Sequence, residues 1–166
     1  MKTLTTLMLG LGLTVSAVAN AGGIAVIDLA KVVENSTYLK QQNASLQQSV
    51  KPTSTKLEQL GKELEGLQQK AQTEGPKMNQ ADVQKMTALY QSKLSEFNST
   101  QQGLQAKVQS SLQATNTTFE GRVKQAAEQL RKENNLDFIL NKNSAIASDA
   151  KDDLTDKMIQ KVNAMK

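Results

Sequence analysis

Two pairs of neighbouring carboxylates come closest to a reactive grouping in this chain: Glu63 with Glu65, and Asp152 with Asp153. Paired carboxylic acids can divide the roles of general acid and general base between them. Both pairs lie in polar stretches, where neighbouring acids are far more often solvated surface. The chain also contains no His and no Cys, so the commonest general base, metal ligand and thiol nucleophile are missing. We therefore predict a protein that is not an enzyme, with no catalytic residues, no metal site and no cofactor.

The glycines do not form a phosphate-binding loop either. Phosphate-cradling motifs place several glycines a few residues apart, between a strand and a helix. Here Gly61, Gly66, Gly103 and Gly121 stand singly within stretches of helical periodicity. The sequence thus offers no nucleotide-binding motif.

The first residues have the form of an export signal. Lys2 precedes an uncharged apolar run over residues 4–18, and Ala19-Asn20-Ala21 then supplies a small-x-small pattern. This combination predicts a signal peptide over residues 1–21 that is cleaved after Ala21, and a mature protein in the periplasm. The alternative is a membrane anchor, but the apolar run is shorter than the roughly 20 residues that span a bilayer.

Composition and charge favour a long exposed helix over a compact globule. Aromatic residues make up 3% of the chain and Trp is absent, whereas Gln, Lys, Leu, Ala and Ser dominate. Such a composition is typical of a helix with a narrow apolar stripe. The 20 Lys and Arg residues against 16 Asp and Glu give a mild net charge of +4, or +3 without Lys2. This balance argues against nucleic acid as a partner.

The centre of the chain has the apolar spacing of an antiparallel helical hairpin. From about Thr37 onward, apolar residues recur at steps of three and four, as in a coiled coil. Gly75 and Pro76 interrupt this pattern, because Gly favours a helix C-terminus and Pro cannot continue the hydrogen-bonded ladder. The apolar residues after the break mirror those before it, with Leu67 expected opposite Val83. The predicted arm seam consists of Leu57, Leu60, Leu64, Leu67, Val83, Met86, Tyr90 and Leu94.

The hairpin arm is predicted to occupy residues 37–114, and its return helix continues to about Asn134. At roughly 1.5 Å per residue, an arm with about 37 residues in each helix is some 55 Å long. Its tip is expected near residues 74–79, at Gly75, Pro76, Lys77 and Met78.

Pro52 lies within the outgoing helix of the arm, where it removes a backbone donor and crowds the preceding turn. Gly61, Gly66 and Gly103 each weaken a helix by about 1 kcal/mol relative to Ala. A selected hinge and drift in a tolerant coil both explain these residues, and both predict an arm that bends. Pro52 is therefore a candidate hinge.

The stretch from Met86 to Phe119 is polar but almost uncharged, since Lys93, Glu96 and Lys107 are its only charged residues. An ordinary polar helix face explains this composition. The alternative is a wetted wall that touches an unfolded polypeptide without holding it tightly.

The two ends of the chain predict a small body of mixed structure. Residues 23–29 are an apolar, β-branched run, which predicts a strand buried on both faces, and a helical turn is expected at residues 30–34. Residues 136–141 predict a second strand, followed by a turn at residues 142–144 that leads into residues 145–148.

A closing helix is predicted from about Asp149, because the segment begins with acidic and ends with basic residues, as the helix dipole prefers. The body then comprises residues 22–36 and 115–166. The apolar stripe of the closing helix consists of Leu154, Met158, Val162 and Met165.

A body of this size is too small to sustain its own core with two long helices attached. Association of several copies is the simplest remedy, because the open edges of short apolar strands would then close against those of other copies. The residues expected to be buried in this oligomerisation body are Ile24, Val26, Ile27, Phe138, Ile139 and Leu140.

Taken in order, these segments resemble the Skp/OmpH family of periplasmic chaperones, and the likeness covers essentially the whole chain after residue 21. The segments that carry the likeness are Ile24-Ala25-Val26-Ile27-Asp28, Leu136-Asp137-Phe138-Ile139-Leu140 and Asp153-Leu154-Thr155-Asp156-Lys157-Met158-Ile159-Gln160-Lys161-Val162. A Gln/Lys/Leu-rich hairpin lies between the first and the second of them. The resemblance implies a mostly helical α+β fold in a homotrimer, where terminal strands assemble a small β-barrel and three helical arms surround a cavity.

The resemblance further implies an ATP-independent holdase that binds unfolded outer-membrane proteins between its arms and prevents their aggregation. Arm tips in this family are often strongly basic, whereas residues 70–85 here carry a net charge of only +1. Peripheral contact with anionic membrane lipids is therefore a weaker expectation than binding of unfolded protein. The rival hypothesis is a structural coiled-coil spacer or scaffold of the cell envelope.

Overall fold

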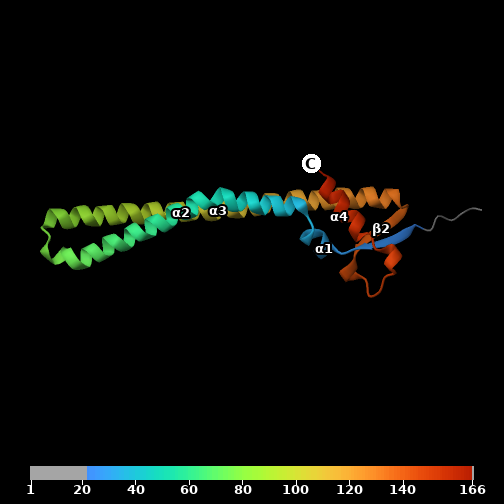
Figure 1. Cartoon of the computed structure of the whole chain (residues 1–166), viewed down its shortest axis with the longest axis horizontal. Helices are drawn as coiled ribbons and strands as arrows, with labels where there is room; N and C mark the ends of the chain where they lie inside the picture. Colours follow the sequence, from blue (N-terminus) through green and yellow to red (C-terminus); the bar gives the residue numbers. More distant parts are fainter. Residues whose placement is uncertain (1–21, 166) are drawn as a thin grey trace, which may run out of the picture.

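The computed structural model describes residues 22–165, and the predicted signal peptide over residues 1–21 lies outside this part of the chain. A long antiparallel pair of helices extends from a small body at one end (Figure 1). The elements are β1 (Gly23–Ile27), α1 (Leu29–Glu34), α2 (Thr37–Glu74), α3 (Gln80–Glu133), β2 (Leu136–Asn141) and α4 (Thr155–Ala164), with 3-10 turns at Gly75–Lys77, Lys142–Ser144 and Ala150–Asp152. Long helices beside one small sheet confirm the predicted mostly helical α+β fold.

Side-chain caps define where the two long helices begin. The Ser36 hydroxyl accepts a hydrogen bond from the backbone N–H of Leu39 (3.2 Å), so α2 starts at Thr37. At the tip, the Asn79 side-chain oxygen accepts from the N–H of Asp82 (2.9 Å), and α3 follows. The break and the start of the return helix therefore coincide with the residues whose chemistry predicts them.

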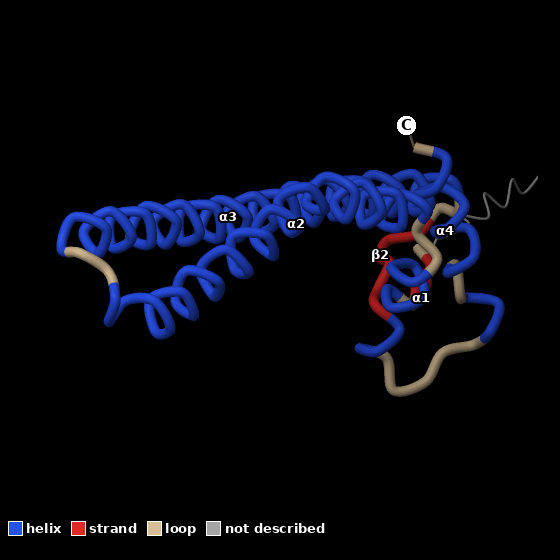
Figure 2. Tube along the Cα trace, turned by 60° about the vertical axis from the view of Figure 1, so that its left-hand side comes forward, coloured by secondary structure: helices blue, strands red, loops and turns tan. Residues whose placement is uncertain are grey.

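The two strands pair in parallel, with Ile24 opposite Phe138 and Val26 opposite Leu140. A parallel pair requires a crossover from the end of one strand to the start of the next. Here the whole α2–α3 hairpin lies between β1 and β2 and serves as this crossover (Figure 2). The body thus joins the two ends of the chain at the base of the arm.

The core of the body lies where α4 packs against the end of α3. Met158 and Val162 of α4 are completely buried, together with Leu130 and Ala126 of α3. The four-residue spacing on each helix places these side chains on one face, which explains why two short stretches suffice to form a core. The remaining buried members are Ala25, Ile27, Val32, Phe119 and Leu154.

The strand β1 is shorter and less buried than predicted. It ends at Ile27, because the Asp28 carboxylate caps α1 by accepting from the Lys31 N–H (3.1 Å). The prediction of burial on both faces was wrong for the single chain, since Ile24 is 53% exposed. In the single chain, the face of the sheet that carries Ile24 is not covered by another layer.

The predicted start of the closing helix at Asp149 was also wrong, since α4 begins at Thr155. The Leu154 N–H donates to the Val26 carbonyl (2.9 Å), and Asp153 forms an isolated parallel bridge with Val26. This pairing pulls the preceding segment along the free edge of β1, where it cannot be helical. The Asp149 carboxylate instead caps a 3-10 turn at Ala150–Asp152.

Asp153 joins three parts of the body. Its carboxylate accepts from the Lys142 ammonium (2.7 Å) and from the Thr155 N–H (2.9 Å), while the Thr155 hydroxyl accepts from the Asp28 N–H (2.9 Å). The hydrogen bond from Lys142, followed by those from Thr155, lowers the pKa of Asp153 from 3.8 to about 2. The folded state thus favours the ionised carboxylate.

Substitution Asp153→Asn should reduce the acid sensitivity of the fold. Because the folded-state pKa lies below the ordinary value, the ionised group contributes its full stability above about pH 4 and loses it as the pH falls towards 2. Because the side chain is partly exposed, we expect the substitution to lower the free energy of unfolding by about 1–2 kcal/mol at neutral pH, and by less as the pH falls. Urea unfolding of both proteins between pH 7 and pH 2 measures this. Parallel pH profiles would contradict it.

Candidate functional site

The predicted arm seam lies between α2 and α3, but its burial is uneven. Leu60 is 3% exposed and forms the best-packed point of the arm. Val83 and Leu94 are each 38% exposed. The half-buried members are Leu57, Leu64, Leu67, Met86 and Tyr90. The seam is therefore tight at Leu60 and looser on both sides of it.

Three polar contacts hold the two arm helices together between the body and the middle of the arm. Lys107 donates to the backbone carbonyl of Ser49 (2.9 Å), and Lys56 pairs with Glu96 (2.8 Å). Further out, the Lys93 ammonium lies 2.7 Å from the Glu63 carboxylate. Hydrogen bonds from Lys93 and then Gln59 lower the pKa of Glu63, and the same bond to Glu63 raises the pKa of Lys93.

These contacts use every charged residue of the otherwise uncharged stretch that the sequence singled out, namely Lys93, Glu96 and Lys107. The sequence did not predict this role for them. The signal was present in the opposite charges of Lys56 and Glu63 on the facing helix, but these pairs become visible only once the register of the hairpin is known. The polar stretch is therefore partly structural.

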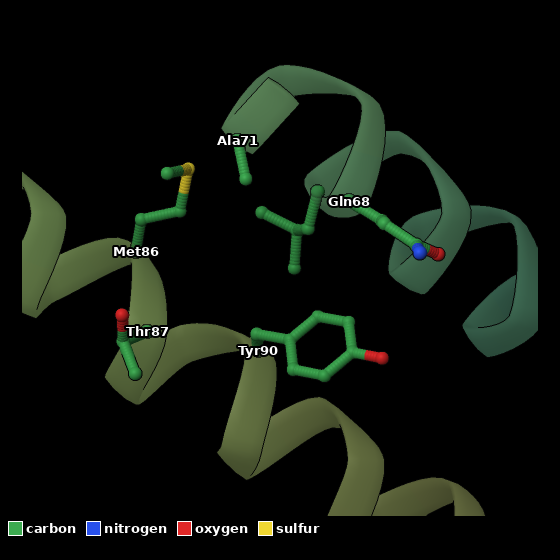
Figure 3. Close-up of a pocket in the computed structure, with 6 residues that line it drawn as sticks. Gln68, Ala71, Met86, Thr87 and Tyr90 are labelled. Atoms are coloured by element: carbon green, nitrogen blue, oxygen red, sulfur yellow. The ribbon is translucent and has the colours of Figure 1, made fainter. Parts of the chain in front are cut away.

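Beyond the Lys93–Glu63 pair, α2 and α3 diverge toward the tip (Figures 1 and 2). Leu67 shares a pocket of about 310 Å³ with Met86 and Tyr90, and the side chains of α2 and α3 line its two sides (Figure 3). The predicted partner Val83 does not line this pocket. Leu67 thus lies beside residues one and two turns further along α3 than predicted.

The predicted tip residues form a tight connection. Gly75, Pro76 and Lys77 make the 3-10 turn, and the Met78 N–H donates to the Gly75 carbonyl (3.2 Å). Pro76 fits here because the first residues of a helical turn need no backbone donor. Lys77 is exposed, and Met78 is half-buried.

The candidate hinge Pro52 lies inside an uninterrupted α2. A proline weakens the helical hydrogen bonds of the turn before it, which leaves carbonyl groups available to other donors. The cross-arm bond from Lys107 ends on the carbonyl of Ser49, within that turn. Whether the arm bends here stays a prediction.

Replacing Pro52 with Ala should stabilise α2 by about 1–3 kcal/mol, since it restores a helical hydrogen bond and removes a clash. Circular dichroism during thermal unfolding measures the gain. If Pro52 is a hinge, the stiffer arm should also accept a narrower range of client sizes. An unchanged range in a demonstrably stiffer arm would assign Pro52 to drift.

The base of the arm is fixed to the body by α4. The Asn163 side chain accepts from the Thr37 N–H (2.9 Å) and donates to the Asn35 carbonyl (3.0 Å), bridging the junction of α1 and α2. The Arg122 guanidinium lies 4.1 Å from the centre of the Tyr38 ring and donates to the Met165 carbonyl (2.7 Å). The start of α2 is therefore held in place by contacts with α3 and the C-terminal segment.

Helix α3 carries separate exposed apolar side chains along its length. Leu94 lies exposed in a shallow groove with Gln, Ser and Asn side chains around it. Leu89 and Leu112 are also exposed on this helix. Such a surface gives many weak apolar contacts and few charge contacts.

The predicted oligomerisation residues divide between the two faces of the sheet. On one face, Ile27 is buried in the core and Ile139 is half-buried against it. On the other face, Phe138 is 60% and Leu140 41% exposed, beside Ile24; Val26 pairs with Leu140 and lies on this face too, but it is buried. We call Ile24, Phe138 and Leu140 the open sheet face; their burial stays a prediction about an assembly.

Across residues 22–165, no cluster of acidic side chains could hold a metal ion, and none of the helices is long and apolar enough to span a membrane. What this part of the chain offers is an arm and an open sheet face.

A sequence model of the family described as Outer membrane protein (OmpH-like) matches residues 23–162, from the first strand to the closing helix. The chain belongs to the OmpH-like family. None of the curated proteins matches the chain. The family match covers the arm and both strands, so the elements described above are those of the family.

The fold of this OmpH-like protein is also found in a solved structure. It is the crystal structure of a candidate outer membrane chaperone (OmpH-like) from Caulobacter crescentus CB15. The two chains share 15% identity with a TM-score of 0.74, and the likeness covers 86% of this chain and 85% of the other. At this identity the likeness supports the fold.

Proposed function

We propose that this protein is an ATP-independent holdase chaperone of the periplasm that keeps unfolded outer-membrane proteins from aggregating. The observation that carries the proposal is the family match over residues 23–162. The related fold is named as a candidate outer membrane chaperone, and the arm of this chain has a surface suited to weak contacts. No nucleotide is needed, because release follows when the client folds elsewhere.

The working form in this proposal is a homotrimer. The two-stranded sheet packs on the helices with one face only, and the open sheet face exposes Ile24, Phe138 and Leu140 to water. Three copies that meet on this face would cover these side chains and complete a small barrel. Their arms would then project together around a common cavity.

Holding depends on the number of contacts, not on the strength of any one. Several weak binding surfaces around one cavity raise the effective concentration of each for a captured client. Client segments kept apart in this way cannot pair their strand edges with one another. Leu89, Leu94 and Leu112, exposed along α3, are suited to such contacts.

Light scattering tests the holdase proposal directly. A urea-unfolded outer-membrane β-barrel protein is diluted into buffer without nucleotide, with and without equimolar trimer. We expect scattering to be suppressed, and the client to be recovered in a soluble complex. A long coiled coil such as tropomyosin at the same concentration is the control.

The rival is a structural spacer of the cell envelope, which would ignore unfolded proteins. Unchanged scattering would favour it. Peripheral contact with anionic membrane lipids stays a separate prediction, tested by sedimentation with anionic and neutral vesicles.

A further inference from the structure

The outer part of the arm is split. The last polar contact between α2 and α3 in the described chain is the Lys93–Glu63 pair at 2.7 Å. Beyond it, the ion pairs stay within one helix: Lys70 with Glu74 (3.8 Å) on α2, and Lys85 with Asp82 (3.9 Å) on α3. Within residues 22–165, no ion pair or hydrogen bond joins the two helices again between this pair and the turn at the tip.

Two adjoining hollows lie between α2 and α3 in this outer part of the arm. The inner one, about 310 Å³, is lined by Leu67, Ala71, Met86 and Tyr90, besides two polar residues (Figure 3). The outer one, about 590 Å³, continues past Leu67 and Met86 to the tip. We call the two hollows the tip cleft. Both volumes fall in the range of about 300–1,000 Å³ that is usual for binding sites.

The tip cleft is present because the seam of α2 has a small side chain at Ala71. Packed helices need side chains that fill the 8–10 Å between their axes. Ala71 supplies one methyl group where the preceding seam positions supply leucines. Met86 and Tyr90 consequently stay half-buried, with apolar surface directed into the cleft.

The charged residues that line the tip cleft include one more lysine than acidic residues. They are Lys70, Glu74, Lys77, Asp82 and Lys85, a net charge of +1. Both acids are paired with lysines of their own helix, and Asp82 also accepts from the Asn79 amide (2.8 Å). Among residues 22–165, Lys77 has no ion-pair partner, so it can meet a carboxylate from outside.

We propose that the tip cleft takes one large apolar side chain of an unfolded polypeptide, while Lys77 pairs with a carboxylate on a neighbouring residue of that polypeptide. The inference rests on the proposed function and adds to it a defined contact point within each arm. The apolar lining suits an aromatic or long aliphatic side chain, and Lys77 favours segments in which such a side chain stands beside Asp or Glu.

A short Gly/Ser peptide with one Trp followed by Asp is the probe. Because the protein contains Tyr but no Trp, excitation at the long-wavelength edge of the Trp band, where Tyr does not absorb, reports on the peptide alone. Entry into the tip cleft should shift its emission to shorter wavelength, and a titration gives the Kd. A second peptide with Lys in place of Asp should bind about two- to fivefold more weakly, as expected for one exposed ion pair.

Filling the tip cleft should abolish this binding. We expect Ala71→Phe to raise the Kd of the Trp-Asp peptide about tenfold or more, because burial of one large apolar side chain supplies at least that much affinity. Ala88→Phe is the matched control, because Ala88 is an exposed alanine at the same level of the arm that does not line the cleft. It should bind like the native protein.

The charge is tested separately by Lys77→Glu, which should remove the preference for Asp over Lys in the peptide. Lys62→Glu is its control, since Lys62 is exposed on α2 and does not line the cleft. Circular dichroism checks that each variant keeps its helices.

Three results would overturn the proposal. The first is a native protein that leaves the Trp emission unshifted, or an Ala71→Phe variant that binds as tightly as the native one. The second is displacement of the peptide by phosphatidylglycerol vesicles that bind native protein but not Ala71→Phe, which would assign the cleft to lipid. The third is a changed sedimentation mass for Ala71→Phe, which would assign it to a second copy of the chain.

Failure of the proposed function looks different. A native protein that binds the peptide but does not suppress client aggregation would contradict the holdase proposal and leave the cleft in place. Full suppression of aggregation by a native protein that does not bind the peptide would do the reverse.

Discussion

A protein in which residues 57–94 are replaced by a short Gly-Asn turn is expected to stay folded, to assemble normally and to lose its ability to hold unfolded clients. The deletion removes the middle and the tip of the arm symmetrically. Lys56 and Glu96, whose charged groups lie 2.8 Å apart, then form the last cross-arm pair before the new turn. The contact between Lys107 and Ser49 still joins the two helices below it.

The expected loss is large because the shortened protein keeps the body but not the walls of the cavity. A cage that works by many weak contacts loses avidity when most of its surface is removed. Scattering of a urea-unfolded outer-membrane protein should therefore rise to the level seen without chaperone. Sedimentation and circular dichroism provide the controls for assembly and fold.

Undiminished protection by the shortened protein would place client binding in the body. In that case the arm would be a spacer, and the cavity mechanism would be wrong.

Substitution Phe138→Asp is expected to convert the trimer into single folded chains. Phe138 is 60% exposed in the isolated chain and lies on the open sheet face, so the fold of one subunit does not depend on it. Enclosure of this ring between subunits would make Phe138→Ala cost about 3–5 kcal/mol. A buried carboxylate without a partner costs more, which should shift dissociation into the micromolar range or above.

Sedimentation equilibrium at micromolar concentration measures this effect, and far-ultraviolet circular dichroism shows whether the helices persist. Leu112→Asp is the matched control, because Leu112 is comparably exposed but lies on α3 in the arm. It should sediment as the native protein does. A native protein that is a stable monomer, or a Phe138→Asp protein that stays assembled, would contradict the proposed trimer.

The helices of the arm could be located from sequence because their signals are local. Ser36 and Asn79 cap the helices that follow them, and Gly75 with Pro76 ends the first. Each of these residues acts on backbone groups within four positions of itself. Each of these interactions therefore lies within a short stretch of sequence and can be predicted from it.

The start of α4 could not be located in this way. Acidic residues at Asp149 and Asp152 have the form of a helix N-terminus, yet the chain there lies along β1. The bond that decides it runs from the Leu154 N–H to the carbonyl of Val26, a residue from the other end of the chain. Periodicity and capping rules contain no information about such a partner.

Residue types and spacing by themselves determined that this chain forms a long helical hairpin between two short apolar strands and contains neither His nor Cys, and the order of its segments resembles the OmpH-like family. Tertiary structure decided how those elements meet. It placed Lys93 against Glu63, divided the strand residues between a core and the open sheet face, and left the cleft beside Ala71 unfilled. The physical reason is range: propensity and capping act within a helical turn, whereas register, strand coverage and helix spacing depend on side chains far apart in the chain.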